Sequence, residues 1–209
     1  MIDHVEVDLR AALLGVRDQQ ARPTCLAHAI TAAHEHTRRA SAYLSPEYLH
    51  FFANQGSSSG ISMGEVATAL KVEGQIAEIH CPYLPHSPPP AWKPPAGLAV
   101  YRRDSEPKRA TSAALAKWIG AGRAPILGLT LPESFFNPAA PWVISPEGPL
   151  RGLHAVAGAG LGRHRGDRVF LIRNSWGPDW GDGGYAWLDE GFVKRHLKEL
   201  ILLTHEVFP

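Results

Sequence analysis

This 209-residue sequence has little cysteine, no excess of charge of one sign and no long hydrophobic run. Its two cysteines, Cys25 and Cys81, allow at most one disulfide, which excludes a disulfide-rich secreted scaffold. The 21 basic residues balance 20 acidic ones, so nucleic acid and an anionic membrane surface are poor candidates for partners. No apolar run approaches the ~18 residues that a membrane helix needs, and residues 1–4 lack the features of a secretory signal. We therefore expect a globular protein that is cytoplasmic as synthesised.

Local signals in the first part of the chain are helical. Apolar residues recur with helical spacing after Pro23, which predicts a helix that opens at Thr24 or Cys25. A capping residue followed by proline predicts a second helix start at 45–47, and capping-box spacing predicts a third at 62–65.

The second part of the chain carries strand signals. The proline-rich stretch 81–95 cannot form a helix or a central strand, so we expect an extended crossing segment there. One more helix, 112–120, precedes short apolar runs bounded by glycine and proline. The predicted strands are 124–131, 154–160, 169–173 and 184–188. This order indicates an α+β fold with two lobes and a ligand site in the cleft between them.

Cys25 is the first candidate for chemistry, because the N-terminus of a helix lowers the pKa of a thiol placed there and so favours the thiolate. The alternative is a small buried hydrophobic residue. A nucleophilic thiol needs a base, and the base needs a group that orients it. His154 begins one predicted strand and Asn174 follows another, so adjacent strands could present both at one edge.

Three separated motifs, in the order Cys, His, Asn, resemble the papain-like cysteine peptidases. Residues 15–29 resemble the nucleophile segment, with Gln19 six residues before Cys25, and residues 153–160 are similar to the segment of the catalytic histidine. Residues 174–185, Asn-Ser-Trp-Gly-Pro-Asp-Trp-Gly-Asp-Gly-Gly-Tyr, match the asparagine motif over its whole length. The resemblance extends from about residue 7 to residue 208.

The resemblance implies a single domain over 1–209, with a helical lobe at about 10–105 and a β-barrel-like lobe at about 106–205 to which residues 1–9 cross. It also implies a cysteine endopeptidase. Cys25 would be the nucleophile, His154 the acid and base, and Asn174 the residue that orients His154. The side-chain amide of Gln19 would stabilise the oxyanion. Trp176 would shield the hydrogen bond of Asn174, although Trp176 and Trp180 could also be simple core aromatics.

No cofactor is expected. The histidines around 34–36 lack the spacing of a zinc motif, so no metal site is expected either.

The sequence departs from the family pattern at several positions. Arg22 stands in place of a disulfide-forming cysteine and Leu26 in place of tryptophan, which leaves Cys81 as a packing residue. At Gly60-Ile61 the family has two glycines, so the side chain of Ile61 would narrow the substrate groove. The expected substrate-binding residues, around a pocket expected to be apolar, are Gly60, Ile61, Met63, Leu153, Ala155 and Trp176.

The chain starts close to the position where mature family enzymes start, so no inhibitory prosegment is expected. We therefore expect narrow specificity for a protein or peptide substrate, and control by an inhibitory, immunity-type partner protein. A bacterial effector or toxin delivered into another cell without a cleavable signal is the matching hypothesis. The alternatives are an acyl-transfer enzyme of the transpeptidase or transglutaminase kind, and a non-catalytic peptide-binding protein.

Overall fold

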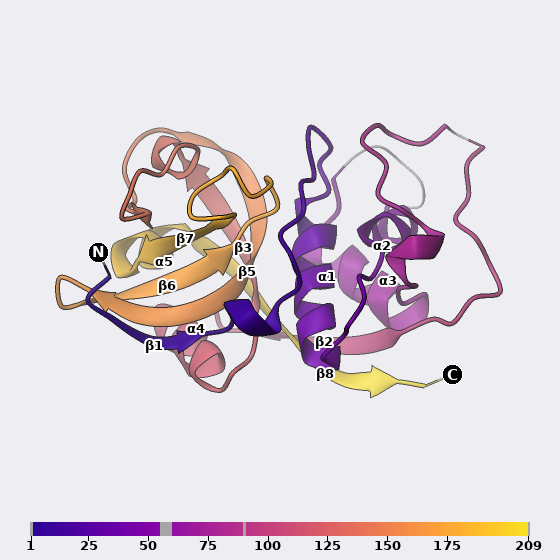
Figure 1. The fold of residues 1–209 in the computed structure, drawn as a ribbon, viewed down its shortest axis with the longest axis horizontal. Helices are drawn as coiled ribbons and strands as arrows, with labels where there is room; N and C mark the ends of the chain where they lie inside the picture. Colours follow the sequence, from indigo (N-terminus) through magenta and orange to yellow (C-terminus); the bar gives the residue numbers. More distant parts are fainter. Residues whose placement is uncertain (1, 55–59, 90, 209) are drawn as a thin grey trace.

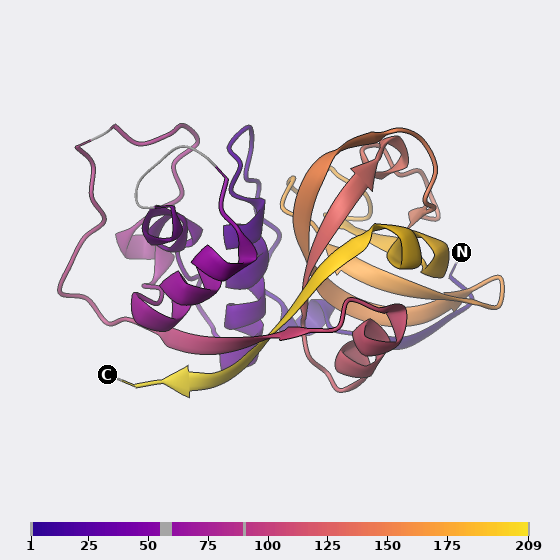
Figure 2. The ribbon, with the colours of Figure 1, turned by 180° about the vertical axis from the view of Figure 1, so that it is seen from behind.

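The computed structural model describes residues 2–54, 60–89 and 91–208. Helices α1, α2 and α3 gather in one lobe and most of the strands lie in the other, as Figure 1 shows. In the reverse view of Figure 2, two long strands, β2 (Arg102–Lys108) and β8 (Leu197–Val207), run from the sheet lobe to beneath the helical lobe. The two lobes are therefore tied together by paired strands as well as by side-chain packing.

The helical lobe contains α1 (Cys25–Arg38), α2 (Pro46–Ala53) and α3 (Met63–Val72). All three predicted helix starts are confirmed. The Ser45 hydroxyl accepts a hydrogen bond from Tyr48 N, with Pro46 in the first turn, and Ser62 and Glu65 form a complete capping box. α1 ends where Arg39 adopts a left-handed conformation with φ 52°.

The sheet has eight strands and is not closed into a barrel. Its order is β2-β8-β3-β5-β6-β7-β4, and β1 (His4–Asp8) pairs with β5 beyond that path. β5 and β6 pair antiparallel as a hairpin. The remaining strands are β3 (Ile126–Pro132), β4 (Val143–Ile144), β5 (Leu150–His164), β6 (Asp167–Arg173) and β7 (Tyr185–Asp189).

The predicted helix at 112–120 is confirmed as α4 (Ser112–Gly120), and the four predicted strands lie within or overlap β3, β5, β6 and β7. Sequence analysis missed α5 (Glu190–His196), which Asp189 caps, and strands β1, β2, β4 and β8. Short 3-10 turns lie at η1 (Arg10–Ala12), η2 (Glu78–His80) and η3 (Glu133–Phe135).

α1 is the central helix of the molecule and is buried along most of its length. Its small residues Ala29 and Ala33 share one hydrophobic cluster with Ala155 and Ala159 of β5. Small side chains on both sides allow the helix to approach the strand closely.

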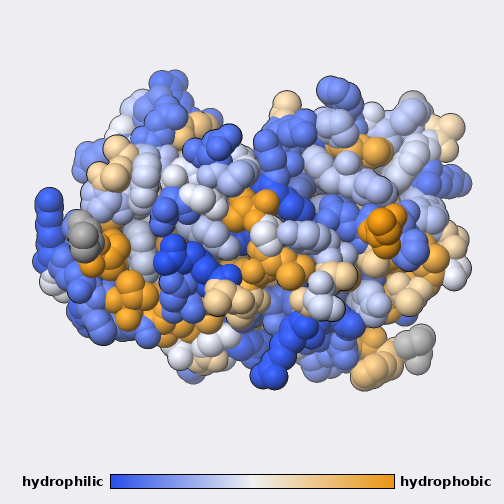
Figure 3. Space-filling view, in the orientation of Figure 1, coloured by the Kyte–Doolittle hydropathy of each residue, from blue (hydrophilic) through white to orange (hydrophobic). Residues whose placement is uncertain are grey.

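Hydrophobic and hydrophilic residues are mixed over the face shown in Figure 3. Within the described ranges, no helix has the length and apolar character required to cross a membrane.

Arg22 forms a buried ion pair beside the segment that leads to Cys25. Its Nη2 lies 3.0 Å from Glu47 Oε1, its Nη1 also contacts Glu47, and Nη1 donates to Leu84 O at 2.6 Å. The guanidinium lies over the ring of Tyr83, 5.1 Å from its centroid. Both Cys25 and Cys81 are free thiols, and Cys81 is buried as the sequence predicts. A two-pronged arginine–carboxylate pair therefore anchors this segment to α2 without a disulfide.

Replacement of Arg22 should destabilise the protein strongly, because Glu47 is 1% exposed and would keep a buried, unpaired charge. We expect Arg22→Ala to lower the free energy of unfolding by about 3–5 kcal/mol, measured by urea denaturation with and without reductant. The matched control is Arg10→Ala, whose partner Asp8 is partly exposed, with an expected loss of about 1 kcal/mol or less. Equal losses in the two variants would contradict the anchoring role of Arg22.

Five of the described histidines are buried, and the pKa values of four of them are lowered far below the ordinary value. Burial lowers the pKa of His28 and His34 to about 3 and that of His50 and His154 to about 4. The unfolded chain takes up protons on these histidines below pH ~6.5, whereas the folded chain does not. Their contribution to stability is therefore complete above that pH and declines as the pH falls toward their folded values.

As the pH falls from ~6 to ~4.5, we expect each of these four histidines to lower the free energy of unfolding by about 1.4 kcal/mol per pH unit. Denaturation curves collected across this range measure the slope. His34→Gln should reduce it by one such increment, whereas the exposed His86→Gln should leave it unchanged. Burial raises the pKa of Glu35, which acts in the opposite direction, so the comparison of variants isolates the histidine contribution. An unchanged slope in His34→Gln would contradict the prediction.

Candidate active site

Cys25 is the first residue of α1 and lies on the wall of the groove between the lobes. Burial is the largest influence on its thiol and raises its pKa. Backbone N–H groups of Ala155, Leu26 and Cys25 itself act in the opposite direction, because they stabilise the thiolate. The expected lowering of the pKa at the helix N-terminus is therefore outweighed by burial.

His154, which lies within β5, and Asn174, which directly follows β6, form a hydrogen-bonded pair. His154 Nε2 lies 2.7 Å from Asn174 Oδ1, and the same oxygen accepts a hydrogen bond from Ser175 N at 2.8 Å. Because this oxygen can only accept, His154 carries its proton on Nε2 and leaves Nδ1 as the free nitrogen of the neutral ring. Burial lowers the pKa of His154 to about 4, and the bond to Asn174 acts against this shift.

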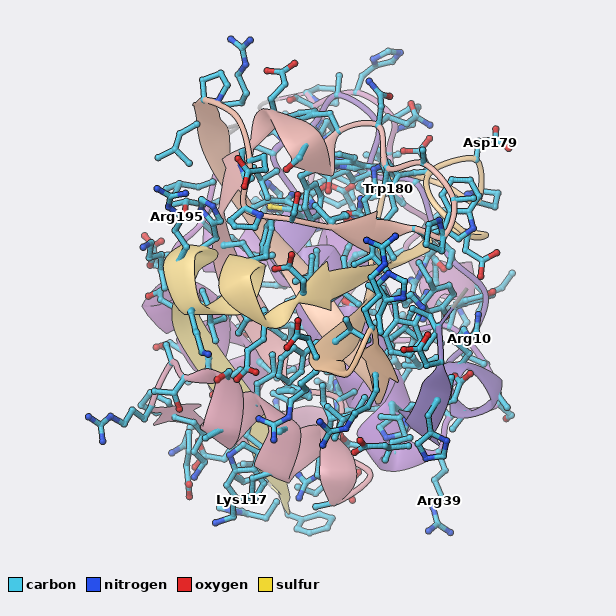
Figure 4. The ribbon with its side chains drawn as sticks, turned by 90° about the vertical axis from the view of Figure 1, so that its left-hand side faces the viewer. Arg10, Arg39, Lys117, Asp179, Trp180 and Arg195 are labelled. Atoms are coloured by element: carbon cyan, nitrogen blue, oxygen red, sulfur yellow. The ribbon has the colours of Figure 1, made fainter. Side chains whose placement is uncertain are left out.

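An aromatic cluster covers this pair. The ring of Trp176 lies 4.7 Å from that of His154, and Phe136 stacks on Trp176 with centroids 5.4 Å apart. Trp180 lies deeper and donates its indole N–H to Phe135 O. Figure 4 shows Trp180 among the crowded side chains of the sheet lobe, while its neighbour Asp179 projects outward. Trp176 therefore contacts the candidate imidazole directly, whereas Trp180 is a core residue.

Gln19 is buried and held in one orientation. Its Oε1 accepts a hydrogen bond from Ser175 Oγ at 2.7 Å, and its Nε2 donates to Arg22 O at 2.8 Å. Its backbone N–H donates to Ser175 O at 2.7 Å. An amide nitrogen carries two hydrogens, so one Nε2–H stays available for a ligand.

A groove of about 590 Å³ unites most of the residues predicted to form the site. Gly60 and Met63 line it from the helical lobe, and Leu153 and Ala155 line it from β5. The rest of the predicted set that lines it is Cys25, Ile61 and His154. Asn174 and Trp176 are joined to the groove through their contacts with His154, and Gln19 through Ser175.

Sequence analysis missed the charged residues of the groove, which are Glu65, Lys198 and Glu199. The expectation of an apolar pocket is therefore incomplete. Glu199 reaches the groove because β8 pairs with β3, with Glu199 opposite Gly128. No local motif in the sequence signals that pairing. In the parts of the chain that the structure describes, no three His, Cys, Asp or Glu side chains gather in a way that could hold a metal ion.

Curated proteins match this chain over short segments. A KDEL-tailed cysteine endopeptidase of Arabidopsis thaliana is 53% identical over 36 residues, which cover 17% of this chain and 10% of that protein. Pro-cathepsin H of Bos taurus is 42% identical over 38 residues, 18% of this chain and 11% of that protein. These matches span only about a tenth of the length of each relative.

Solved structures match nearly the whole fold. Xylellain, a cysteine protease from Xylella fastidiosa, superimposes with a TM-score of 0.82 at 20% identity, over 95% of this chain and 85% of that one. The proform of the ragweed cysteine protease Amb a 11 gives 0.77 at 21% identity, over 94% of this chain and 64% of that one. The predicted papain-like two-lobe fold is confirmed. The family described as papain family cysteine protease matches residues 4–199. The chain belongs to the papain family of cysteine proteases.

Proposed function

We propose that this protein is a cysteine endopeptidase that hydrolyses peptide bonds through an acyl-enzyme on Cys25. The observation that carries the proposal is the placement of a thiol, an imidazole and an orienting amide at one groove. The thiol and the imidazole come from different lobes, so a peptide laid along the groove would meet both. A binding protein has no need of this arrangement.

In the first half of the reaction, Cys25 Sγ attacks the peptide carbonyl carbon as its proton passes to His154 Nδ1. The carbon–sulfur bond forms, and the carbonyl electron pair moves onto oxygen. The tetrahedral intermediate then collapses, the carbon–nitrogen bond breaks, and His154 gives its proton to the departing amine. Asn174 keeps the imidazole in one orientation during both proton transfers, because its Oδ1 accepts a hydrogen bond from the Nε2–H of His154.

The negative oxygen would be held by the free Nε2–H of Gln19 and the backbone N–H of Cys25. One donor of this kind is typically worth about 3–4 kcal/mol in the transition state. In the second half, His154 Nδ1 takes a proton from water, the hydroxyl attacks the thioester carbon, and the carbon–sulfur bond breaks. The acid is released, and His154 passes the proton from its Nδ1 to the Cys25 sulfur.

Narrow specificity is part of the proposal, and two side chains support it. Ile61 lines the groove and also packs against the core, which limits its movement. Leu153, beside His154, is 81% exposed at the groove wall, so an apolar substrate residue would gain by covering it. Most peptides would lack a side chain that both fits beside Ile61 and covers Leu153.

Delivery as a bacterial effector, under the control of an inhibitory partner, stays a prediction from the sequence. The groove offers such an inhibitor a clear target, because one segment laid across it would block both Cys25 and His154. Co-purification from the native host followed by an activity assay would test this prediction.

The proposed activity predicts a small set of new protein N-termini when the enzyme is incubated with a bacterial lysate. The cuts should disappear with Cys25→Ala, because no other thiol lies in the groove. N-terminal labelling with mass spectrometry makes this measurement, and Cys81→Ser serves as the matched control that should keep the cuts. Cuts that persist in Cys25→Ala would refute the assignment. Products ligated to an added amine, in excess of hydrolysis, would instead indicate acyl transfer.

Asn174→Ala should reduce kcat/KM by about tenfold to a hundredfold while the protein stays folded. The substitution removes the acceptor of the Nε2 proton, so the imidazole loses both its orientation and its preferred tautomer. A peptide taken from the lysate experiment supplies the assay, with the exposed Asn137→Ala as control. A loss of less than twofold would show that Asn174 does not orient His154.

A further inference from the structure

A small cavity lies between α1, β5 and the end of β6, away from the groove. Its volume is about 10 Å³, which is the space that one water molecule occupies. Ala29 and Ala32 of α1 and Ala155 of β5 form one part of its wall, and their small side chains leave this space open. The other residues that line it are polar: Arg17, His28, Arg173, Asn174 and Ser175.

Three polar atoms of this wall are buried without a protein partner. Across residues 2–54, 60–89 and 91–208, no group forms a hydrogen bond with His28 Nε2, Arg173 Nη1 or Asn174 Nδ2. The three residues that carry these atoms all line the cavity. Buried polar groups without a partner are unfavourable and rare, so three of them around one cavity indicate a ligand that they share.

The other two polar residues of the wall are engaged elsewhere. Arg17 Nη1 donates to Leu44 O at 2.8 Å, and Arg17 Nη2 donates to Glu35. Ser175 Oγ donates to Gln19 Oε1 at 2.7 Å. The hydrogen bonds that a ligand in the cavity must supply are therefore those of the three unpaired atoms.

These three atoms are complementary to a water molecule. His28 Nδ1 lies 3.0 Å from Thr24 O, which can only accept, so Nδ1 carries the proton and Nε2 of the neutral ring is an acceptor. Burial keeps the ring neutral because it lowers the pKa of His28 to about 3. Arg173 Nη1 and Asn174 Nδ2 are donors, and one water oxygen accepts from both while an O–H donates to His28. A halide has no proton for His28, and a metal ion would face the charge of Arg173.

We propose that the cavity holds one water molecule, and that His28 and Arg173 are positioning residues that act through it on Asn174. The water accepts the Nδ2–H of Asn174, which fixes the amide with its Oδ1 toward His154. This orientation keeps the proton on His154 Nε2 and leaves Nδ1 free to exchange a proton with Cys25. An amide turned over would present Nδ2 to His154 and favour the opposite tautomer. The inference rests on the proposed peptidase function and adds two residues to the set that orients its base.

A high-resolution crystal structure of the protein tests the water directly. The electron density should show a single peak in the cavity, within about 2.7–3.2 Å of His28 Nε2, Arg173 Nη1 and Asn174 Nδ2. Density without a peak in the cavity, or with a peak beyond hydrogen-bond distance of Asn174 Nδ2, would overturn the proposal.

Substitution of His28 tests the positioning role. His28→Phe removes the acceptor but keeps a ring beside Tyr83, whose centroid lies 4.7 Å away. We expect kcat to fall about fivefold or more while KM changes less than about twofold. NMR of ring-¹⁵N-labelled protein should show that His154 loses its single Nε2-protonated tautomer. His28→Gln, whose amide oxygen accepts a hydrogen bond, should restore both readouts.

The matched control is His50→Phe. His50 is likewise buried, and its Nδ1 finds no partner in the described part of the chain, but it does not line the cavity. This variant should keep the wild-type kcat and the wild-type tautomer of His154, because it removes a buried histidine without touching the proposed water.

The density and the NMR spectra need no substrate, so they separate this inference from the proposed function. Wild type that shows the water and the single tautomer but cleaves no peptide would refute the peptidase function and support the role of the water. Cleavage by wild type with unchanged kcat and tautomer in His28→Phe would overturn the positioning role and leave the peptidase function intact. Equal losses in His28→Phe and His50→Phe would overturn it as well.

Discussion

The close packing of α1 against β5 is the constraint on which the site depends. Alanines face each other across this contact, so the helix that carries Cys25 and the strand that carries His154 approach closely. One side brings the thiol from the helical lobe, and the other brings the imidazole from the sheet. A larger side chain at Ala29 or Ala155 would push the two lobes apart before it disturbed the packing inside either lobe. The geometry of the candidate site is thus a property of the core between the lobes.

Much of this arrangement was accessible from the sequence because its signals are local. Ser45 and Ser62 lie within four positions of the helical residues that they cap, so a short window of sequence predicts both helix starts. The run from Asn174 to Tyr185 is likewise recognisable as one continuous motif. β8 gives no comparable signal, because it is defined by its partners β2 and β3, far away in the chain. Glu199 was missed for the same reason, since it enters the groove only through its pairing with Gly128. Pairings between distant strands are set by the whole fold and leave little trace in a short window of sequence.

In the helical lobe, an ion pair fixes the position of the segment before Cys25, which a disulfide could also do. The Arg22–Glu47 pair holds the segment before Cys25 to α2, and Tyr83 secures the same segment by donating to Gln19 O at 2.7 Å. Since the described thiols are both free, the position of Gln19 and Cys25 depends on hydrogen bonds and ion pairs rather than on redox state. The strength of such a pair depends on its burial, because water would screen it. Burial is therefore as necessary to this anchor as the residues themselves.

The same burial affects both members of the candidate catalytic pair, Cys25 and His154. It raises the pKa of Cys25 and lowers that of His154, so each group resists carrying a charge alone. A thiolate and an imidazolium formed together attract one another most strongly in the same surroundings, because the local dielectric is low. The N–H groups of Ala155 and Leu26 and the oxygen of Asn174 each stabilise one member of the charged pair. Proton transfer from thiol to imidazole is then favoured only as a concerted event. A peptide that excludes water from the groove would strengthen this coupling at the moment when the nucleophile is required.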